Sequence, residues 1–118
     1  MIEPILCSVA GIMFEGREKA ASECEVGENL MLLWEPTNKY DPNAVMVCRV
    51  LDMGDGAIGF GGQIGYVPRA LAGVVSQHLR DGVELVTTVT STIIDPRGQF
   101  TPDITIRIEE RKVEHGQS

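Results

Sequence analysis

Residues 35–44 read EPTNKYDPNA and connect two apolar runs, LMLLW at positions 30–34 and VMVCRVL at positions 45–51. Pro36 and Pro42 each fix their own φ angle and favour an extended conformation in the residue before them. The asparagine and aspartate side chains of the stretch can bond their own backbone and stabilise tight turns. Because the connection lacks glycine and is longer than a simple reversal requires, we expect a stiff surface loop that holds side chains in fixed positions. A rigid structural connection whose tyrosine covers the core is the alternative.

The two flanking runs are apolar on both faces, which is typical of strands in a small barrel or in a sheet covered on both sides. Near the C-terminus, isoleucines alternate with polar residues and predict a last strand with one face towards water. Altogether we expect strands at residues 5–12, 29–34, 44–51, 63–67 and 84–94 and through Ile104, Ile106 and Ile108. Residues 17–28 are expected to form a loop with room for one helical turn, and the five glycines of residues 52–62 favour a flexible excursion.

A single amphipathic helix is expected at residues 68–80. Pro68 suits the first position of a helix, Gly82 suits the position just past its end, and the leucines and valines between them share one face. Gly73 in the helix interior indicates close packing at that point. Residues 95–98, Asp-Pro-Arg-Gly, have the pattern of a type I turn that closes a hairpin. The chain is therefore predicted to be mainly β, a six-stranded OB/SH3-like small barrel with one α-helix between strands 4 and 5.

The totals fit one globular domain, which we place at residues 1–111, followed by a polar tail at residues 112–118. The apolar runs are far shorter than the roughly 20 residues that cross a bilayer, so no membrane association is expected. The N-terminus has neither the basic start nor the long apolar centre of a signal peptide, which predicts a cytoplasmic protein.

Catalytic and metal-binding patterns do not stand out in the sequence. Cys7, Cys24 and Cys48 are an odd number without a Cys-x-x-Cys pair, so we expect no disulfide framework and no zinc site, with Cys7 and Cys48 buried as small apolar residues. Of the two histidines, His78 lies on the expected helix as a partly covered surface residue and His115 lies in the tail. Without a phosphate-binding glycine loop, a paired acid cluster or a nucleophile with a base, we expect neither an enzyme nor a cofactor.

The net charge of −7 limits the ways in which this chain can bind nucleic acid. Sequence-independent affinity for nucleic acid depends on Lys and Arg side chains that neutralise phosphates. Any nucleic-acid binding is therefore expected over a short local patch, or within an assembly that supplies positive charge.

Three segments taken together resemble the HIRAN domain, namely residues 9–12 (VAGI), 35–45 (EPTNKYDPNAV) and 64–69 (IGYVPR). This domain occurs at the start of helicase-like transcription factor and related DNA translocases, and as a stand-alone protein in bacteria and phages. The resemblance covers residues 5–111. It implies a six-stranded OB-like barrel that binds single-stranded DNA, grips its free 3′-hydroxyl end and serves DNA repair or replication-fork processing, with a helicase or nuclease as the partner.

The resemblance also implies a set of end-binding residues. The family's arginine and aromatic pair after the first strand falls on Met13 and Phe14, so the arginine is missing here. Tyr66 stands where the family's best-understood member has a histidine. The other matching positions are Asn38, Tyr40 and Asp41 in the loop and Phe100 after the last hairpin turn.

The chemistry of these residue types agrees with such a role. The aromatic rings of Tyr40, Phe14 and Phe100 can each stack a base. An ionised Asp41 only accepts hydrogen bonds, so it can take a sugar hydroxyl and repels a phosphate. The last phosphates of a strand can be bound by Asn38, Arg69 and the backbone near Asn43.

Alternatives remain open for several of these positions. Asp41 can simply cap the turn through the N–H of Asn43, Tyr66 and Phe100 can be core residues, and Arg69 can be a solvated surface charge. On the level of function, the alternative is a protein–protein interaction or structural barrel domain that does not bind DNA and uses the barrel edge and the loop to hold a peptide or a second copy of itself. The oligomeric state stays open.

Overall fold

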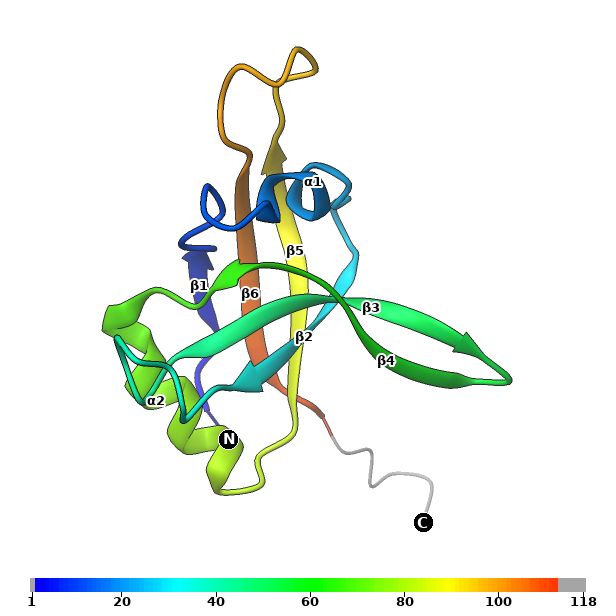
Figure 1. Ribbon diagram of the computed structural model, residues 1–118. Coiled ribbons are helices and arrows are strands. Elements are labelled where there is room, and N and C mark those ends of the chain that lie inside the picture. Colours follow the sequence, from blue (N-terminus) through cyan, green and yellow to red (C-terminus); the bar gives the residue numbers. More distant parts are fainter. Residues whose placement is uncertain (1, 113–118) are drawn as a thin grey trace.

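Six antiparallel strands form one strongly curved sheet in the order β1-β6-β5-β2-β3-β4, and two helices pack against it (Figure 1). The computed structural model describes residues 2–112, so the predicted polar tail lies outside the described residues except for Lys112. The elements are β1 (Ile5–Ser8), α1 (Arg17–Ser22), β2 (Asn29–Trp34), β3 (Val45–Gly54), β4 (Ala57–Tyr66), α2 (Arg69–Arg80), β5 (Leu85–Ile93) and β6 (Asp103–Glu110).

The sheet curls into a small barrel, and its two edges, at β1 and β4, meet at a single point. The chain just beyond β1 approaches β4, where Ala10 and Tyr66 exchange two backbone hydrogen bonds of 2.8 Å. Gly65 makes this approach possible, since a Cβ at that position would collide with the carbonyl oxygen of Ala10 and with Val9. The predicted OB-like small barrel is therefore confirmed, although the sheet is not strictly closed.

The core lies inside this barrel and includes the isoleucines of β6, whose alternation with polar residues predicted this strand. Ile104, Ile106 and Ile108 on β6 are all fully buried, while Arg107 between them is exposed. The apolar faces of β3 and β4 meet them from the other side, through residues such as Val47 and Ile64. Of the cysteines, Cys24 and Cys48 are buried and Cys7 is only partly buried, and His78 is partly covered on α2 as expected.

The predicted helix is confirmed as α2, which lies between β4 and β5 and covers one end of the barrel (Figure 1). Pro68 immediately precedes the first helical residue instead of forming it. The close packing expected at Gly73 is wrong, because a Cβ there would meet only the Nδ2 atom of Asn43, at 3.8 Å. No helix among residues 2–112 is long and apolar enough to cross a membrane.

Residues 52–62 are not a flexible excursion, and this expectation was wrong. They form the outer half of a long hairpin of β3 and β4, which projects from the barrel (Figure 1). Asp55 and Gly56 both have positive φ angles, 52° and 79°, at the centre of the two-residue turn. An Asp-Gly pair is a strong signal for such a hairpin turn. β1 is also shorter than predicted, because the chain turns away at Gly11, whose φ is 71°.

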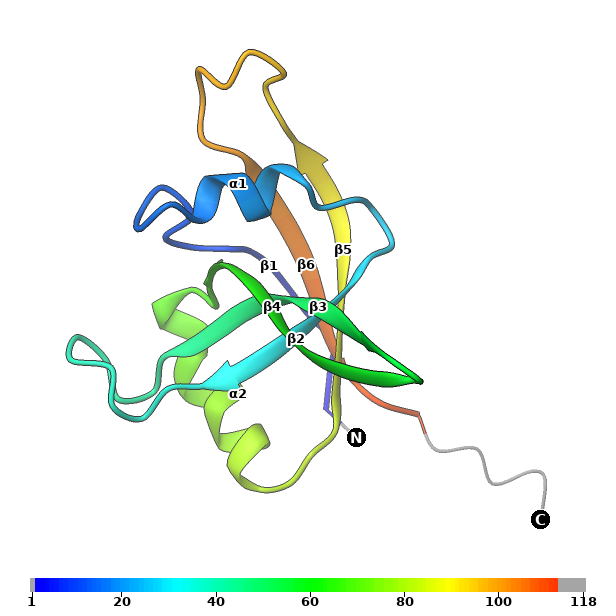
Figure 2. The same cartoon turned by 45° about the vertical axis from the view of Figure 1, so that its right-hand side comes forward.

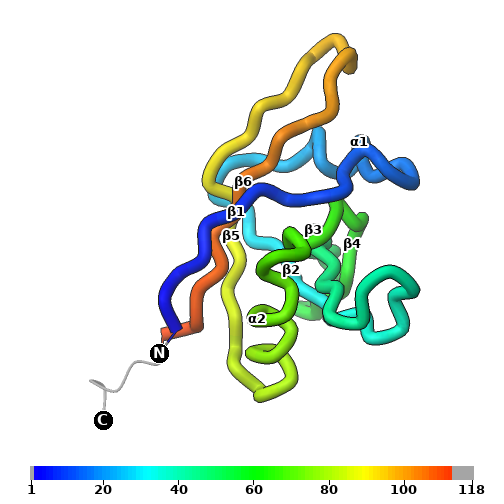
Figure 3. Tube along the Cα trace, turned by 90° about the vertical axis from the view of Figure 1, so that its left-hand side faces the viewer, coloured from blue at the N-terminus to red at the C-terminus, as the bar shows by residue number. Residues whose placement is uncertain are grey.

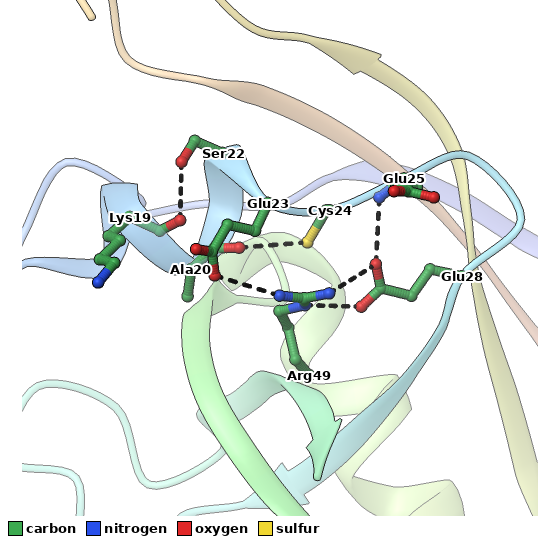
Figure 4. Close-up of polar contacts among 8 residues, drawn as sticks. All are labelled: Lys19, Ala20, Ser22, Glu23, Cys24, Glu25, Glu28 and Arg49. Atoms are coloured by element: carbon green, nitrogen blue, oxygen red, sulfur yellow. Dashed lines mark hydrogen bonds and ion pairs between the residues drawn. The ribbon is translucent and has the colours of Figure 1, made fainter. Parts of the chain in front are cut away.

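The loop expected at residues 17–28 begins with a second helix, α1, which is fastened to the barrel by one ion-pair cluster (Figure 4). Arg49 on β3 donates from Nε to Glu28 at 2.7 Å and from its terminal nitrogens to Glu28 and Glu23 at 3.2 and 3.3 Å. The hydrogen bond to Glu28 raises the pKa of Arg49 above its usual value. This cluster holds the chain on the C-terminal side of α1 against β3, and so helps to position the helix.

Candidate functional site

The loop at residues 35–44 is held by hydrogen bonds to its own backbone. Its ends are joined where the N–H of Glu35 donates to the carbonyl oxygen of Ala44 at 2.8 Å. At its centre, Oδ1 of Asn38 accepts from the N–H groups of Tyr40 and Asp41 at 2.9 and 3.0 Å. These bonds are the local turns that the Asn and Asp residues predicted, and they define the path of the loop without glycine.

A carboxylate also ties the loop to the end of β4. Oε1 of Glu35 accepts a hydrogen bond from the Tyr66 hydroxyl at 2.8 Å and another from Asn38 Nδ2 at 2.7 Å. Burial, followed by the hydrogen bond to Glu35, raises the pKa of Tyr66 above its usual value. Tyr66 is therefore partly buried and bonded to the loop, which makes it the floor of the site and not a residue of the central core.

Tyr40 points away from the barrel, with 76% of its surface exposed. The alternative in which this ring covers the core is therefore wrong. The Lys39 ammonium lies 5.3 Å from the centroid of the ring, and the two backbone bonds from Asn38 fix the main chain on which the ring stands. An exposed aromatic side chain on an ordered backbone is suited to contact a planar ligand.

An open pocket of about 720 Å³ lies between this loop and the segment that leads from β1 into α1. Figures 2 and 3 show the two segments on the same side of the molecule. We call this the loop pocket. Its walls are residues 10–17 on one side and Glu35–Tyr40 on the other, with Tyr66 between them. Phe14, 60% exposed, lines the first wall, so the pocket brings together the predicted residues Phe14, Asn38, Tyr40 and Tyr66.

A second, smaller depression of about 190 Å³ lies on the other side of Tyr40. It is lined by Asp41 and Arg69 and shares Asn38, Tyr40 and Tyr66 with the loop pocket. Oδ1 of Asp41 accepts from the N–H of Asn43 at 2.9 Å, so Asp41 does cap the turn. Arg69 is exposed and its guanidinium approaches the carbonyl oxygen of Tyr40 at 3.5 Å.

Phe100 does not join either depression. It is 73% exposed on the connection between β5 and β6, so the alternative that it is a core residue is wrong. It lines a separate hollow of about 190 Å³ beside α1. The turn predicted before it is present as a hydrogen-bonded β-turn, with the N–H of Gly98 donating to the carbonyl oxygen of Asp95 at 2.9 Å. A strand bound in the loop pocket would need to extend past α1 to touch this ring.

Arg17 is the residue of the site that the sequence did not reveal. It is the first residue of α1, and only 8% of it is exposed. Its guanidinium carbon lies 4.9 Å from the centroid of the Tyr66 ring, and one terminal nitrogen donates to the carbonyl oxygen of Gly11 at 2.9 Å. Met13 is an exposed apolar residue that does not line the loop pocket, whereas the arginine four positions later does. A signal for the helix start at position 17 was present in Gly16, a residue tolerated at the N-cap, followed by the run REKAA.

Among residues 2–112, no group of three or more His, Cys, Asp and Glu side chains has the geometry of a metal site. The two depressions are lined by aromatic rings, carboxylates, an amide and guanidinium groups. These groups can stack a planar ring, accept from a hydroxyl and donate to an anion.

Comparisons with known proteins identify the family and the fold of the chain. The model of the HIRAN domain family matches residues 5–109. The crystal structure of the HIRAN domain of human HLTF is similar, with a TM-score of 0.63 and 15% sequence identity over 91% of this chain and 74% of that one. A crystal structure of a protein from Lactobacillus plantarum is similar as well, with a TM-score of 0.59 and 20% identity over 91% of this chain and 97% of that one. The search of curated protein sequences gave no match.

Proposed function

The chain belongs to the HIRAN domain family of nucleic-acid-binding modules, and we propose that it takes the free 3′-hydroxyl end of single-stranded DNA into the loop pocket and the smaller depression that adjoins it. The family is one of binding modules and not of enzymes. The observation that carries the proposal is the exposed ring of Tyr40, held on a hydrogen-bonded loop at the rim of an open pocket. A helicase or nuclease that acts on the same strand end is the class of partner that such a module would serve.

Stacking would supply affinity without sequence preference. The rings of Tyr40 and Phe14 stand on opposite walls of the loop pocket and are 76% and 60% exposed. Base stacking on an aromatic side chain contributes about 1–3 kcal/mol per base and is available to every base. Two unpaired bases can therefore be held here, whereas paired bases in a duplex offer no free faces.

Carboxylates at the site would select the hydroxyl end. Asp41 uses Oδ1 to cap the turn, which leaves its second oxygen as an acceptor on the smaller depression. Glu35 likewise uses only Oε1 among the hydrogen bonds of the described residues. A terminal sugar hydroxyl can donate to either oxygen, whereas a terminal phosphate would be repelled.

Phosphates further from the end would meet the predicted donor Arg69. The predicted donor Asn38 already donates from Nδ2 to Glu35 at 2.7 Å and to the Tyr66 hydroxyl at 3.4 Å, so a phosphate there would have to replace one of these bonds. Arg69 is exposed at the edge of the smaller depression and has no carboxylate partner among the described residues, so its guanidinium is accessible to a phosphate. The N–H of Asn43 already donates to Asp41, so a phosphate at that position would have to replace this bond. Phe100 would take part only with a strand long enough to reach the hollow beside α1.

Fluorescence anisotropy tests the proposal. A labelled single strand with a 3′-hydroxyl is compared at low salt with the same strand carrying a 3′-phosphate, and with a duplex of the same sequence. We expect the hydroxyl-ended single strand to bind most tightly. Asp41→Asn, which keeps the cap acceptor but removes the charge, is expected to reduce the discrimination between the two ends. Equal affinity of the wild type for both ends would refute end recognition.

A second candidate function, protein binding, is favoured by the projecting hairpin. Its outer half exposes apolar side chains on both faces, Leu51 (48%) and Met53 (63%) on one and Ile58 (62%) and Phe60 (45%) on the other. Exposed apolar surface of this kind often marks an interaction site. Sedimentation velocity at rising concentration, with Ile58→Asp as the control variant, tests for self-association. A single monomeric species at all concentrations would remove a second copy as the occupant.

A further inference from the structure

Arg17 is a buried cation whose hydrogen-bonding capacity is not fully used. A guanidinium has five N–H donors in a fixed, planar arrangement. One terminal nitrogen of Arg17 donates to the carbonyl oxygen of Gly11, and the other pairs with Glu15, both at 2.9 Å. The Nε atom is buried and has no hydrogen-bond partner among the described residues. A buried donor without a partner is unfavourable, so this group is set up to gain from an added acceptor.

The surroundings of Arg17 fit an acceptor that enters from the loop pocket. The side chain lines that pocket, and its guanidinium carbon lies 4.9 Å from the centroid of the Tyr66 ring. Stacking on the ring restrains the plane of the guanidinium. Planar guanidinium groups held in this way bind the paired oxygens of a phosphate with two parallel hydrogen bonds.

The carboxylate that now pairs with Arg17 is weakly held. The Glu15 side chain is 78% exposed, and the ion pair with Arg17 is its only interaction with a charged group among the described residues. Ion pairs with an exposed partner contribute little, because water competes for the charges. Glu15 also has a φ angle of 57°, a region that residues other than glycine rarely adopt. Glu15 can therefore leave Arg17 at small cost.

We propose that Arg17 is the phosphate-binding residue of the loop pocket, and that Glu15 is an internal competitor which a phosphodiester of the bound strand replaces. The inference rests on the proposed function and adds to it a residue and a competition. It also explains how the pocket obtains an arginine although position 13 is methionine. In the free protein the Glu15 carboxylate accepts from one terminal nitrogen of Arg17. In the complex the phosphate accepts from that nitrogen and from Nε of Arg17.

Two matched charge removals test the competition. Glu15→Gln removes the competing anion, and Glu18→Gln removes an exposed charge from α1 that has no ion-pair partner among residues 2–112. We expect Glu15→Gln to tighten binding of a hydroxyl-ended single strand about two- to fivefold at low salt, the range expected for an ion pair whose carboxylate is exposed. Glu18→Gln should give only the smaller effect of the changed net charge. Equal effects of the two variants would overturn the competitor role.

Arg17→Gln tests the phosphate contact, with Arg107→Gln on the exposed face of β6 as its control. We expect Arg17→Gln to weaken binding about tenfold or more, the loss typical of one charged hydrogen bond. The slope of log affinity against log salt should fall by about 0.7, the value for one phosphate contact on a single strand. In the Arg17→Gln background, Glu15→Gln should no longer tighten binding. An unchanged slope and an unchanged effect of Glu15→Gln would overturn the proposal.

Chemical substitution in the DNA keeps the test independent of protein folding. A strand with one uncharged methylphosphonate linkage next to its 3′ end should bind the wild type more weakly than the unmodified strand. If the same substitution at each neighbouring linkage weakens binding equally, a specific phosphate contact is overturned. If the wild type binds no strand, the proposed function is refuted, but the anion site at Arg17 can still be tested by NMR of the Arg17 Nε–H signal. Titration with inorganic phosphate, with chloride at equal ionic strength as the control, should shift that signal. Equal shifts with both salts would overturn the anion site.

Discussion

Replacement of Tyr40 by alanine should separate a ligand-binding role from a structural one. Only about a quarter of the ring's surface is covered, since 76% of the residue is exposed. A fully buried tyrosine covers about 200 Å², so the covered part is about 50 Å², and its loss costs about 1–1.5 kcal/mol of folding free energy. The hydrogen bonds that fix the loop use the backbone N–H groups of Tyr40 and Asp41 and are kept by alanine.

The expected loss of binding is larger than this loss of stability. One stacked base contributes about 1–3 kcal/mol, which corresponds to an affinity about five- to 150-fold lower for Tyr40→Ala. Anisotropy with a labelled 3′-hydroxyl strand measures the affinity, and thermal and urea denaturation measure the stability. Phe60→Ala provides a matched control, because Phe60 is an exposed aromatic residue on the hairpin, outside the loop pocket.

Three results would refute the reasoning. A Tyr40→Ala protein that binds DNA as tightly as the wild type would show that the exposed ring takes no part in binding. A protein that loses several kcal/mol of stability would show that the ring supports the loop, contrary to its exposure. Equal weakening by Phe60→Ala would mean that the strand binds the hairpin and not the loop pocket.

Three further predictions concern the barrel and its ionisable groups. Gly65→Ala should destabilise the fold by about 3 kcal/mol in urea denaturation, because its Cβ would collide with Ala10 at the closing bridge. Gly73→Ala, at an open helical site, should stabilise the fold by about 1 kcal/mol. Loss of stability in both variants would contradict this. Burial and then the hydrogen bond to a carboxylate raise the pKa of Tyr66 in the folded state, so the unfolded chain loses this proton first, and the free energy of unfolding should fall as the pH rises through about 10. Tyr66→Phe should show a smaller alkaline loss, and an identical pH profile would argue against this assignment. Burial raises the pKa of Cys24 to about 11, so its thiol should react slowly with a disulfide reagent at pH 8 until the protein unfolds, and rapid labelling of the native protein would disagree.

The parts of the fold that follow from local pattern were predictable. The runs around the loop became β2 and β3 because their side chains are apolar on both faces, and the alternation through Ile104 placed β6 correctly. Residues 52–62 were misread because their glycines suggest flexibility, whereas Asp55-Gly56 is a specific turn between two paired strands. The structure of that segment is decided by its two-residue turn and not by its glycine content.

The site was predictable only where one segment of sequence contains it. Asn38 and Tyr40 lie in the same loop, so their proximity follows from the sequence alone. Arg17 joins them only after the chain has turned at Gly11 and the barrel has closed through Ala10 and Tyr66, and no local pattern reports such a contact. Phe100 was predicted for the site but lies outside both depressions, because its position depends on the path of the β5–β6 connection beside α1.

The acidic character of the chain does not extend to the site. The two depressions together are lined by three cations, Arg17, Lys39 and Arg69, and by three carboxylates, Glu15, Glu35 and Asp41, so their charges cancel and the excess of −7 lies elsewhere. At an ionic strength of 0.15 M, charges more than about 8 Å apart are largely screened, so a phosphate in the pocket responds mainly to this neutral group. Loss of Glu15 from Arg17 would leave the group positive by one charge where the phosphate enters. A chain with strong overall repulsion for DNA can therefore hold a strand end locally. Its affinity should rise from very low to moderate salt, because the distant repulsion is screened first. At higher salt the affinity should fall, because the phosphate contacts are then screened as well.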